Sequence, residues 1–370
     1  MKLYEYMAKE VFRAFDIPVP AGRVAASPEE AGEIARELGG DVAVKSQVLA
    51  GGRGKAGGIK FAGCPEEALD AARELLNQEI RGYRVERVLV EEKLTIDQEL
   101  YLAIAVDGAA RSPVVIASSR GGVDIEQVPE ADLIRERIDI RWGFRPYQAR
   151  RLAYRLGLTG AVARGVASIA IRLYRVFRER DAELTEINPL VVCGNDVLAA
   201  DARLNVDDEA LFRHGDLPKV EEGTEIERRV KSFGLSYVEL DGDIAVMANG
   251  AGITMATLDI LQRYGGRPAN FLDAGGGAGT EPTARAIETL LMTRPKAILI
   301  NIFGGITRCD DVAWAIVQVR NTRGIPVPLV VRLVGTNQEE GVRILRENGL
   351  RAYSEMHEAA EKVVALASGV

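Results

Sequence analysis

The sequence is poor in the residues that most often carry covalent or metal chemistry. Its 370 residues include only three cysteines and two histidines. Cys64, Cys193 and Cys309 are widely spaced and odd in number, so they form neither a disulfide framework nor a zinc-binding pattern. The histidines, His214 and His357, lie beside no serine or cysteine motif. These absences exclude a Ser-His-Asp enzyme, a cysteine–histidine nucleophile and a histidine metal site, and they favour a reducing compartment, which we expect to be the cytoplasm.

Long apolar segments are also absent. No apolar run approaches the roughly 18 residues that a membrane helix needs. The first ten residues mix charged side chains into an amphipathic pattern, so we expect neither a membrane span nor a signal peptide. The net charge of −7 argues against nucleic acid as a partner, because phosphate backbones bind basic surfaces. The length predicts two or three domains of a soluble globular protein.

The sequence changes character near its middle. A polar, turn-rich segment over residues 213–228 is predicted to be a linker region. The preceding part mixes helices with strands that read as hairpins. Beyond it, apolar strands alternate regularly with helices that begin just after glycines; the strands are expected over residues 244–248, 269–272, 297–302 and 327–333. We therefore expect an α+β domain over residues 1–225 and a doubly wound parallel sheet, Rossmann-like, over residues 226–370.

A glycine-rich loop is the most conspicuous local motif. Ala50–Gly58 holds five glycines in nine residues, with Arg53 and Lys55 among them. Glycine lets backbone N–H groups wrap polyphosphate oxygens, and the two cations neutralise charge. Lys45 ends an apolar strand just before the loop, where burial is costly unless the ammonium meets an anion. The spacing is not that of a P-loop. We predict a phosphate cradle in a hairpin closed by a strand over residues 59–61, the alternative being a flexible surface hairpin.

An apolar strand predicted over residues 85–91 ends in acidic residues. Glu91 and Glu92 close this strand, and Glu99 follows. Such a strand can place backbone amides on an adenine edge and offer a carboxylate to ribose hydroxyls. The alternative is an ordinary strand with solvated acids.

A second hairpin carries oxygen donors. Glu186 and Asn188 alternate on one predicted strand and so face the same side, and Asp201 lies on its antiparallel neighbour. Three oxygen donors on one face predict a Mg²⁺ site of the kind used with nucleotide phosphates. The alternative is a cluster of polar residues at a strand edge.

Three glycine-rich turns follow strands of the C-terminal half, at Asn249–Gly252, Asp273–Gly279 and Asn301–Thr307. Each is predicted to begin a helix, whose free N–H groups attract carboxylate or phosphate. Turns at the carboxyl ends of strands in one sheet define a ligand crevice. Cys309 falls in the first turn of such a helix, and we interpret it as a packing residue.

Taken together, these motifs resemble the β subunits of succinyl-CoA synthetase (succinate–CoA ligase). The matching blocks are collinear over essentially the whole chain: Leu3–Lys9, Ala50–Gly58, Gly121–Glu126, Glu186–Leu190, Ala210–Arg213, Pro268–Asp273 and Asn301–Ile306. The resemblance implies an ATP-grasp domain followed by a flavodoxin-like CoA-ligase domain that contacts the α subunit.

The resemblance also implies roles for particular residues. The phosphate-contacting set is Lys45, Gly52, Arg53 and Gly54. The base- and ribose-side set is Glu91, Leu94 and Glu99. Asn188 and Asp201 correspond to the Mg²⁺ ligands, and Glu186 to the acid that meets the phosphohistidine of the partner. The succinate carboxylate site corresponds to Asn249, Gly305, Ile306 and Thr307, where Thr307 replaces the valine of some relatives.

The implied chemistry is the reversible conversion of succinyl-CoA, ADP and phosphate into succinate, CoA and ATP, a step of the tricarboxylic acid cycle. It passes through a phosphohistidine on an α subunit that also binds CoA, within an αβ or α2β2 assembly. Pro20 stands where GTP-specific members tend to have a polar residue, which favours ADP/ATP and leaves GDP/GTP open. The alternatives are the β subunit of malate–CoA ligase, a standalone ATP-grasp carboxylate ligase, and a binding module with a degenerate site.

Overall fold

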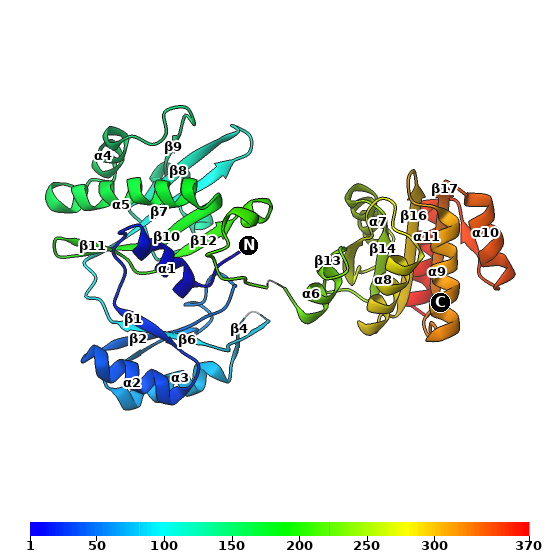
Figure 1. Ribbon diagram of the computed structural model, residues 1–370, viewed down its shortest axis with the longest axis horizontal. Coiled ribbons are helices and arrows are strands. Elements are labelled where there is room, and N and C mark those ends of the chain that lie inside the picture. The colour runs from blue at the N-terminus through cyan, green and yellow to red at the C-terminus, as the bar shows by residue number, and fades with distance from the viewer. Residues whose placement is uncertain (81, 222, 370) are drawn as a thin grey trace. The chain divides into compact units, whose positions relative to one another are not determined.

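The computed structural model describes residues 1–80, 82–221 and 223–369. The chain divides into two compact units, Met1–Glu222 and Gly223–Val370, here called the N-terminal unit and the C-terminal unit. Each has its own sheets and helices (Figure 1). The predicted change of character near the middle of the sequence thus separates two bodies, and the division falls inside the predicted linker region.

The N-terminal unit contains two main sheets. Its elements in chain order are α1 (Glu5–Ala14), β1 (Gly22–Ala25), α2 (Pro28–Leu38), β2 (Val42–Ser46), β3 (Ile59–Ala62), α3 (Pro65–Leu76), β4 (Glu79–Ile80), β5 (Tyr83–Arg84), β6 (Val88–Glu92), β7 (Gln98–Asp107), β8 (Ser112–Ser118), η1 (Ile125–Gln127), η2 (Glu130–Asp132), β9 (Ile134–Arg137), α4 (Pro146–Arg155), α5 (Gly160–Glu179), β10 (Ala182–Cys193), β11 (Asp196–Ala199), β12 (Arg203–Val206) and η3 (Asp208–Arg213).

The first sheet has the antiparallel order β1-β6-β2-β3 and is covered by α2 and α3. Local sequence explains the position of α2: the Ser27 hydroxyl accepts the N–H of Glu30, Pro28 occupies the first turn, and Gly39 ends the helix with φ 72°. The pairing of β2 with β3 confirms the predicted hairpin around the glycine loop. The loop therefore extends from the end of a sheet against which α2 and α3 pack.

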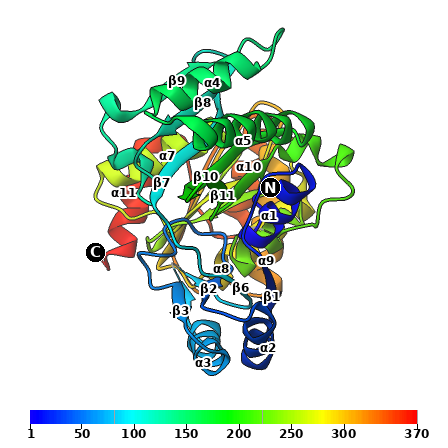
Figure 2. The same cartoon turned by 90° about the vertical axis from the view of Figure 1, so that its left-hand side faces the viewer.

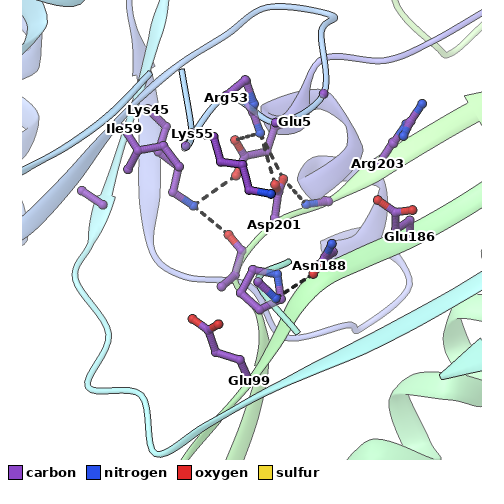
Figure 3. A pocket seen from close by; sticks show the side chains of 18 of the residues that line it. Glu5, Lys45, Arg53, Lys55, Ile59, Glu99, Glu186, Asn188, Asp201 and Arg203 are labelled. Carbon is purple, nitrogen blue, oxygen red and sulfur yellow. Dashed lines mark hydrogen bonds and ion pairs between the residues drawn. The ribbon is translucent and has the colours of Figure 1, made fainter. Parts of the chain in front are cut away.

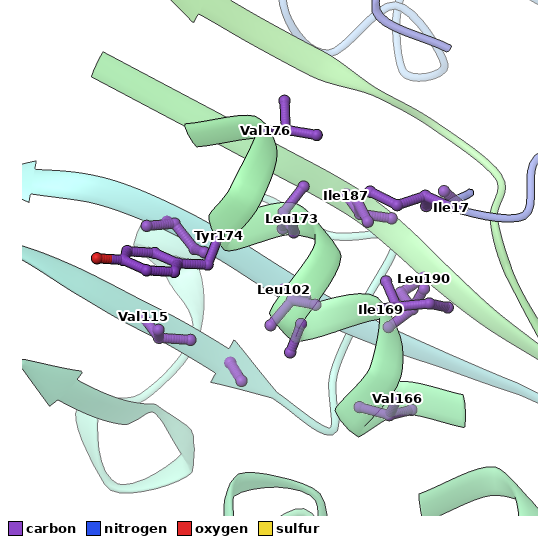
Figure 4. Packing of buried hydrophobic residues seen from close by; sticks show 14 of the residues in the cluster. Ile17, Leu102, Val115, Val166, Ile169, Leu173, Tyr174, Val176, Ile187 and Leu190 are labelled. Carbon is purple, nitrogen blue, oxygen red and sulfur yellow. The ribbon is translucent and has the colours of Figure 1, made fainter. Parts of the chain in front are cut away.

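The second sheet has the order β11-β10-β7-β8-β9, with β12 also paired to β10. Helix α5 crosses its face; in Figure 4, Ile169 and Leu173 of α5 lie over Leu102 and Leu190 of the strands. The helical segment over residues 146–180 is not continuous. It is two helices, α4 and α5, because Gly157 takes a left-handed conformation with φ 80° that ends α4.

Helix α1 connects the two sheets. Figures 1 and 2 both show α1 between the sheet that contains β10 and the sheet that contains β2. On one side the Leu3 N–H donates to the Leu204 carbonyl, and on the other the Lys9 ammonium binds Glu91 of β6. Residues from both sheets therefore meet beside α1.

The C-terminal unit is a three-layer α/β sandwich. Its elements are α6 (Glu225–Lys231), β13 (Ser236–Glu239), β14 (Ile244–Ala248), α7 (Ala251–Arg263), β15 (Asn270–Asp273), α8 (Thr280–Met292), β16 (Ala297–Gly304), α9 (Cys309–Thr322), β17 (Leu329–Gly335), α10 (Gln338–Glu347), β18 (Ala352–Tyr353) and α11 (Met356–Ala367). The sheet order is β13-β15-β14-β16-β17-β18, parallel except for the edge strand β13. Leaving β13 aside, this is the flavodoxin-like order, which confirms the predicted fold.

Each buried apolar cluster found among the described residues belongs to one unit. Two clusters fill the N-terminal unit, one between α5 and its sheet and one beneath α2 and α3. The other two lie on opposite faces of the C-terminal sheet, under α8, α9 and α10 and under α7 and α11. Across residues 1–80, 82–221 and 223–369, no helix has the length and apolar character needed to cross a membrane.

Candidate active site

A cavity of about 680 Å³ opens between the two sheets of the N-terminal unit. This volume suits a ligand of nucleotide size. Figure 3 shows its charged lining. The structure brings together here every site residue predicted in this unit: Lys45, Gly52, Arg53, Gly54, Glu91, Leu94, Glu99, Glu186, Asn188 and Asp201. They come from β2, the glycine loop, β6, the segment between β6 and β7, the start of β7, β10 and the bend between β11 and β12.

The Lys45 ammonium lies among protein acids. Its Nζ is 3.2 Å from Glu5 Oε1 and 2.8 Å from Glu91 Oε2, and it donates to the Ala200 carbonyl at 2.7 Å. Burial alone disfavours the ammonium, but the two carboxylates outweigh burial and raise the pKa of Lys45. The sequence argument that this lysine needs an anion agrees with its pairing to Glu5 and Glu91.

Arg53 is the second buried cation of the cavity. Its guanidinium lies 2.7 Å from Glu5 Oε2 and 3.2 Å from Asp201 Oδ1, and it donates to the Ser46 carbonyl at 2.9 Å. Burial opposes the charged form, yet Glu5 and Asp201 more than compensate, so the pKa of Arg53 is raised. The guanidinium remains charged and is held in one place.

The glycine loop is folded, not loose. Gly52 and Gly57 take left-handed conformations with φ 68° and 74°. Gly58 is packed so closely that an added Cβ would lie 2.5 Å from the Ser46 hydroxyl. At the exposed rim, Lys55 Nζ is 2.6 Å from Asp124 Oδ2, which belongs to the segment after β8. Glycines are thus needed for both conformation and close approach.

The Glu91 carboxylate is engaged by two lysines. Glu91 is buried and its oxygens accept from Lys9 Nζ at 2.6 and 2.7 Å while also contacting Lys45. It therefore has no free carboxylate to offer a ribose. Glu99 is exposed at the cavity edge near Leu94, and these two remain the lining residues suited to base and ribose.

Glu186 lies on β10 beside Tyr101 of β7. The Tyr101 hydroxyl donates to Glu186 Oε2 at 3.0 Å. Burial raises the pKa of Glu186, and neighbouring Asp201 and Glu126 add to this, while Arg203 and the Tyr101 hydroxyl oppose it. A partly buried carboxyl with a raised pKa, held by one directed hydrogen bond, is typical of a functional site.

Asn188 and Asp201 lie near Glu186, as predicted. The register of β10 against β7 shifts between Ile187 and Leu190, so Asn188 lies in a bulge. Asn188 Oδ1 accepts the Gly122 N–H at 2.8 Å, and its Nδ2 donates to the Val123 carbonyl at 2.9 Å. Burial raises the pKa of Asp201, as does Glu5, while Arg53 lowers it.

The oxygen donors of Glu186, Asn188 and Asp201 fit a magnesium ion only if it is bound together with a nucleotide. Over the part of the chain that the structure describes, no group of three or more His, Cys, Asp or Glu side chains is arranged to hold a metal ion. Glu186, Asn188 and Asp201 nevertheless present carboxylate and amide oxygens to one cavity. Because Mg²⁺ is usually held by one or two carboxylates together with substrate phosphates and water, this set fits a metal that arrives with nucleotide.

Sequence reasoning did not identify three residues that support the site. Glu5 and Lys9 of α1 are both buried and lie 2.9 Å apart at their charged ends. The sequence pattern that could have indicated them is a glutamate and a lysine one helical turn apart, on the same helix face as apolar Ala8 and Phe12. Tyr101 gave no comparable signal, because a tyrosine within an apolar strand is ordinary.

In the C-terminal unit, the three glycine turns meet at the carboxyl ends of β14, β15 and β16. Asn249 Nδ2 donates to the Phe303 carbonyl at 2.9 Å and lies 3.3 Å from Thr307 Oγ1. The Gly277 N–H also donates to Thr307 Oγ1, at 3.1 Å. Asn249 and Thr307 flank the point where strand order reverses between β14 and β16, which is where such folds bind ligands.

The members of the predicted carboxylate site differ in exposure. Gly305 and Ile306 are exposed, and Ile306 retains 80% of its accessible surface. Thr307 is buried, and its hydroxyl oxygen joins the turns instead of facing outward. Gly305 and Ile306 are therefore the members of this set that lie at the surface.

The histidines and Cys309 lie outside both sites. His214 Nε2 is 2.8 Å from Asp181 Oδ2, and His357 lies edge-on to the Tyr264 ring. Neither histidine lines the cavity as the structure describes it. Cys309 is fully buried, and burial raises the pKa of its thiol, which agrees with a packing role.

Comparison with known proteins agrees with both units. Residues 2–192 match the family model of the ATP-grasp domain, and residues 247–366 match that of CoA-ligase. A solved ATP citrate lyase from Methanothrix soehngenii, in complex with citrate and coenzyme A, shares the fold with a TM-score of 0.75 at 21% identity, over 100% of this chain and 99% of that one.

Closer relatives are found among curated sequences. The β subunit of ADP-forming succinate–CoA ligase from Herpetosiphon aurantiacus is 48% identical over 377 residues, which cover 99% of this chain and 100% of the relative. The corresponding subunit from Methanothermobacter thermautotrophicus is 47% identical over 376 residues, with 100% of both chains covered. The chain therefore belongs to the β subunits of ADP-forming succinate–CoA ligases, which are acid–thiol ligases.

Proposed function

We propose that this chain is the nucleotide-binding subunit of an enzyme that converts succinyl-CoA, ADP and phosphate reversibly into succinate, CoA and ATP. The observation that carries the proposal is the cavity of the N-terminal unit, where buried Arg53 and partly buried Lys45 face a carboxylate and amide cluster. The coarser statement, that the chain is a β subunit of this ligase family, follows from its relatives.

On the nucleotide side, Lys45 and Arg53 neutralise phosphate oxygens, and backbone N–H groups of Gly52 and Gly54 wrap them. The exposed Glu99 and neighbouring Leu94 receive ribose and base. Asn188 and Asp201 would hold Mg²⁺, which neutralises and orients the phosphates when bound. This arrangement positions the phosphoryl group and stabilises its charge, which is most of what phosphoryl transfer requires.

The phosphoryl group passes to a histidine of another subunit. Among the described residues that line the cavity there is no histidine; His214 is paired with Asp181, and His357 packs against Tyr264. In our proposal an α subunit supplies the phosphohistidine and the CoA site, in an αβ or α2β2 assembly. Glu186, held by Tyr101, then orients the imidazole as its ring nitrogen attacks the terminal phosphorus of ATP; the bond from that phosphorus to the bridging oxygen breaks, and ADP leaves.

The C-terminal unit receives the dicarboxylate. The exposed residues Gly305 and Ile306 lie in the loop that leads into α9, and we place the carboxylate at this loop. Asn249 and Thr307 hold this loop against the neighbouring turns. We place the reaction in the cytoplasm, in keeping with the free cysteines.

Radiolabel transfer tests the proposal. The purified chain, mixed with an α subunit of the family, Mg²⁺ and γ-labelled ATP, should place acid-labile label on a histidine of the α subunit. Omitting this chain should abolish labelling, and adding succinate and CoA should discharge the label. Label retained on this chain, or acyl phosphate formed by this chain alone, would contradict the proposal. Parallel assays with malate and with GTP measure substrate and nucleotide preference.

A further inference from the structure

Lys9 is a buried lysine that the proposed mechanism does not use. Its side chain is only 3% exposed and lies behind the wall of the cavity, which Glu5, Lys45 and Glu91 line. An ammonium buried to this extent is costly unless it is fully paired. Its partners therefore indicate what it does.

Lys9 and Lys45 share the same acceptors. Lys9 Nζ lies 2.9 Å from Glu5 Oε1 and 2.6 Å from Glu91 Oε1, and it donates to the Ala200 carbonyl at 2.8 Å. Lys45 Nζ contacts these same three residues at 3.2, 2.8 and 2.7 Å. The two ammonium groups are thus held side by side by one set of oxygens.

The charges of this buried cluster balance. Lys9, Lys45 and Arg53 are joined by ion pairs to Glu5, Glu91 and Asp201. Without Lys9, the cluster would contain three carboxylates and two cations. The negative charge of Glu5 and Glu91 would then act on Lys45 and Arg53 alone. The two cations that meet phosphate would then be over-neutralised.

We propose that Lys9 is a positioning residue of the nucleotide site. Its positive charge offsets part of the negative charge of Glu5 and Glu91. Lys45 is thereby held in place without being fully neutralised, so it can still attract a phosphate. This inference rests on the proposed function only in that the cavity takes Mg-nucleotide. Lys9 acts through Lys45 and does not itself touch the ligand.

The test is a charge-balance cycle of three variants: Lys9→Gln, Glu91→Gln and the double variant. Their nominal cluster charges are −1, +1 and 0, against 0 in the wild type. Binding of Mg-ADP to the purified chain is measured by titration calorimetry. Because one charge is lost a few ångströms from the phosphates, Lys9→Gln should raise Kd about tenfold. The double variant should return to within about threefold of wild type, and Glu91→Gln should bind at least as tightly as wild type.

A purely structural role predicts a different pattern. If Lys9 only braced α1, neutralising Glu91 would not restore affinity, and this result would overturn the proposal. Equal Kd values for Lys9→Gln and wild type would also overturn it. Should Lys9→Gln fail to fold, the double variant must still bind several-fold more weakly than Glu91→Gln; equal affinities would contradict the role of the Lys9 charge.

Two controls separate this inference from the proposed function. Lys60→Gln removes a lysine paired with Glu74 at the surface of the same unit, outside the cavity lining, and should leave Kd unchanged. In the assembled enzyme, Lys9→Gln should raise the KM for ADP while the KM for succinate stays the same. Failure of the wild type to bind Mg-ADP would count against the proposed function, whereas failure of the cycle alone would count against Lys9.

Discussion

At the scale of single residues, Glu186 shows how burial and one hydrogen bond set the state of a carboxyl group. Burial is the largest cause of its raised pKa, and the Tyr101 hydroxyl opposes the rise by donating to the carboxylate. Burial beside Glu186 also raises the pKa of Tyr101 well above the ordinary tyrosine value, so the phenol stays protonated and remains a donor.

Replacement of Tyr101 by phenylalanine should therefore shift the acid limb of activity to higher pH. Loss of the donor destabilises the ionised carboxylate, so the pKa of Glu186 rises further and the ionised form disappears at a higher pH than in wild type. The pH profile of kcat/KM for the assembled enzyme measures this. Tyr147→Phe, at an exposed tyrosine of α4, is the control. An acid limb that stays in place or moves down would refute the role given to Tyr101.

Which residues could be predicted depended on where their partners lie in the sequence. Lys45, Arg53, Asn188 and Asp201 stand in short motifs that carry their own chemical pattern, and they share one cavity. The pairing of Glu91 with Lys9 was not predicted, because the two residues lie 82 positions apart, a separation at which local spacing says nothing about pairing. Long-range ion pairs of this kind are fixed by the fold, so they become visible only in three dimensions.

At the scale of elements, the glycine loop is a fitted part of the β2–β3 hairpin. The Gly58 N–H donates to the Arg53 carbonyl at 2.8 Å, and the Gly58 carbonyl accepts the Ser46 N–H at 2.8 Å. An added Cβ would lie 2.5 Å from the Ser46 hydroxyl and 2.8 Å from Ile80 Cδ1. The loop therefore closes only if this position has no side chain.

Gly58→Ala should displace the loop and with it Arg53. Overpacking of this kind costs about 1–3 kcal/mol of stability, and we expect the Kd for Mg-ADP to rise as well, because the Arg53 guanidinium depends on the same turn. Thermal unfolding and calorimetry of the purified chain measure both effects. Gly40→Ala is the control, since an added Cβ there meets nothing within 4 Å. Equal behaviour of the two variants would show that the loop is not fitted.

Sequence patterns predicted elements better than the breaks between them. The β-α alternation of the C-terminal unit and the hairpin of the glycine loop were confirmed, because apolar strands and glycine turns repeat regularly. The edge strand β13 and the interruption between α4 and α5 were missed. The strand depends on antiparallel pairing with β15, and the interruption depends on the left-handed conformation of Gly157. Helical or strand periodicity encodes neither feature.

At the scale of the whole molecule, the two units have separate cores. The buried clusters of the N-terminal unit draw on residues up to 217, and those of the C-terminal unit begin at Val230. The intervening segment contributes the partly buried Val220 and Ile226 to the edges of these cores. Each unit therefore has the interior that an independently folding domain needs.

Separate expression of residues 1–222 and 223–370 should yield two folded proteins. Each should show a cooperative thermal transition by circular dichroism, because neither core loses a buried layer when the chain is divided. Mg-ADP at about one hundred times Kd should stabilise only the first fragment, by about 2.7 kcal/mol. Two unfolded fragments would mean that the cores depend on each other. Stabilisation of the second fragment would place the nucleotide elsewhere.

The balanced cluster around Lys9 also bears on ionic strength. Dissolved ions screen the charges that they can approach, over about 8 Å at physiological salt, and the Lys9, Glu5 and Glu91 side chains are nearly sealed from solvent. Concentrated salt therefore leaves these pairs intact while it weakens the exposed pair of Lys55 and Asp124 at the rim. Lys45 and Arg53 therefore keep their places as ionic strength changes, and only the rim of the cavity responds.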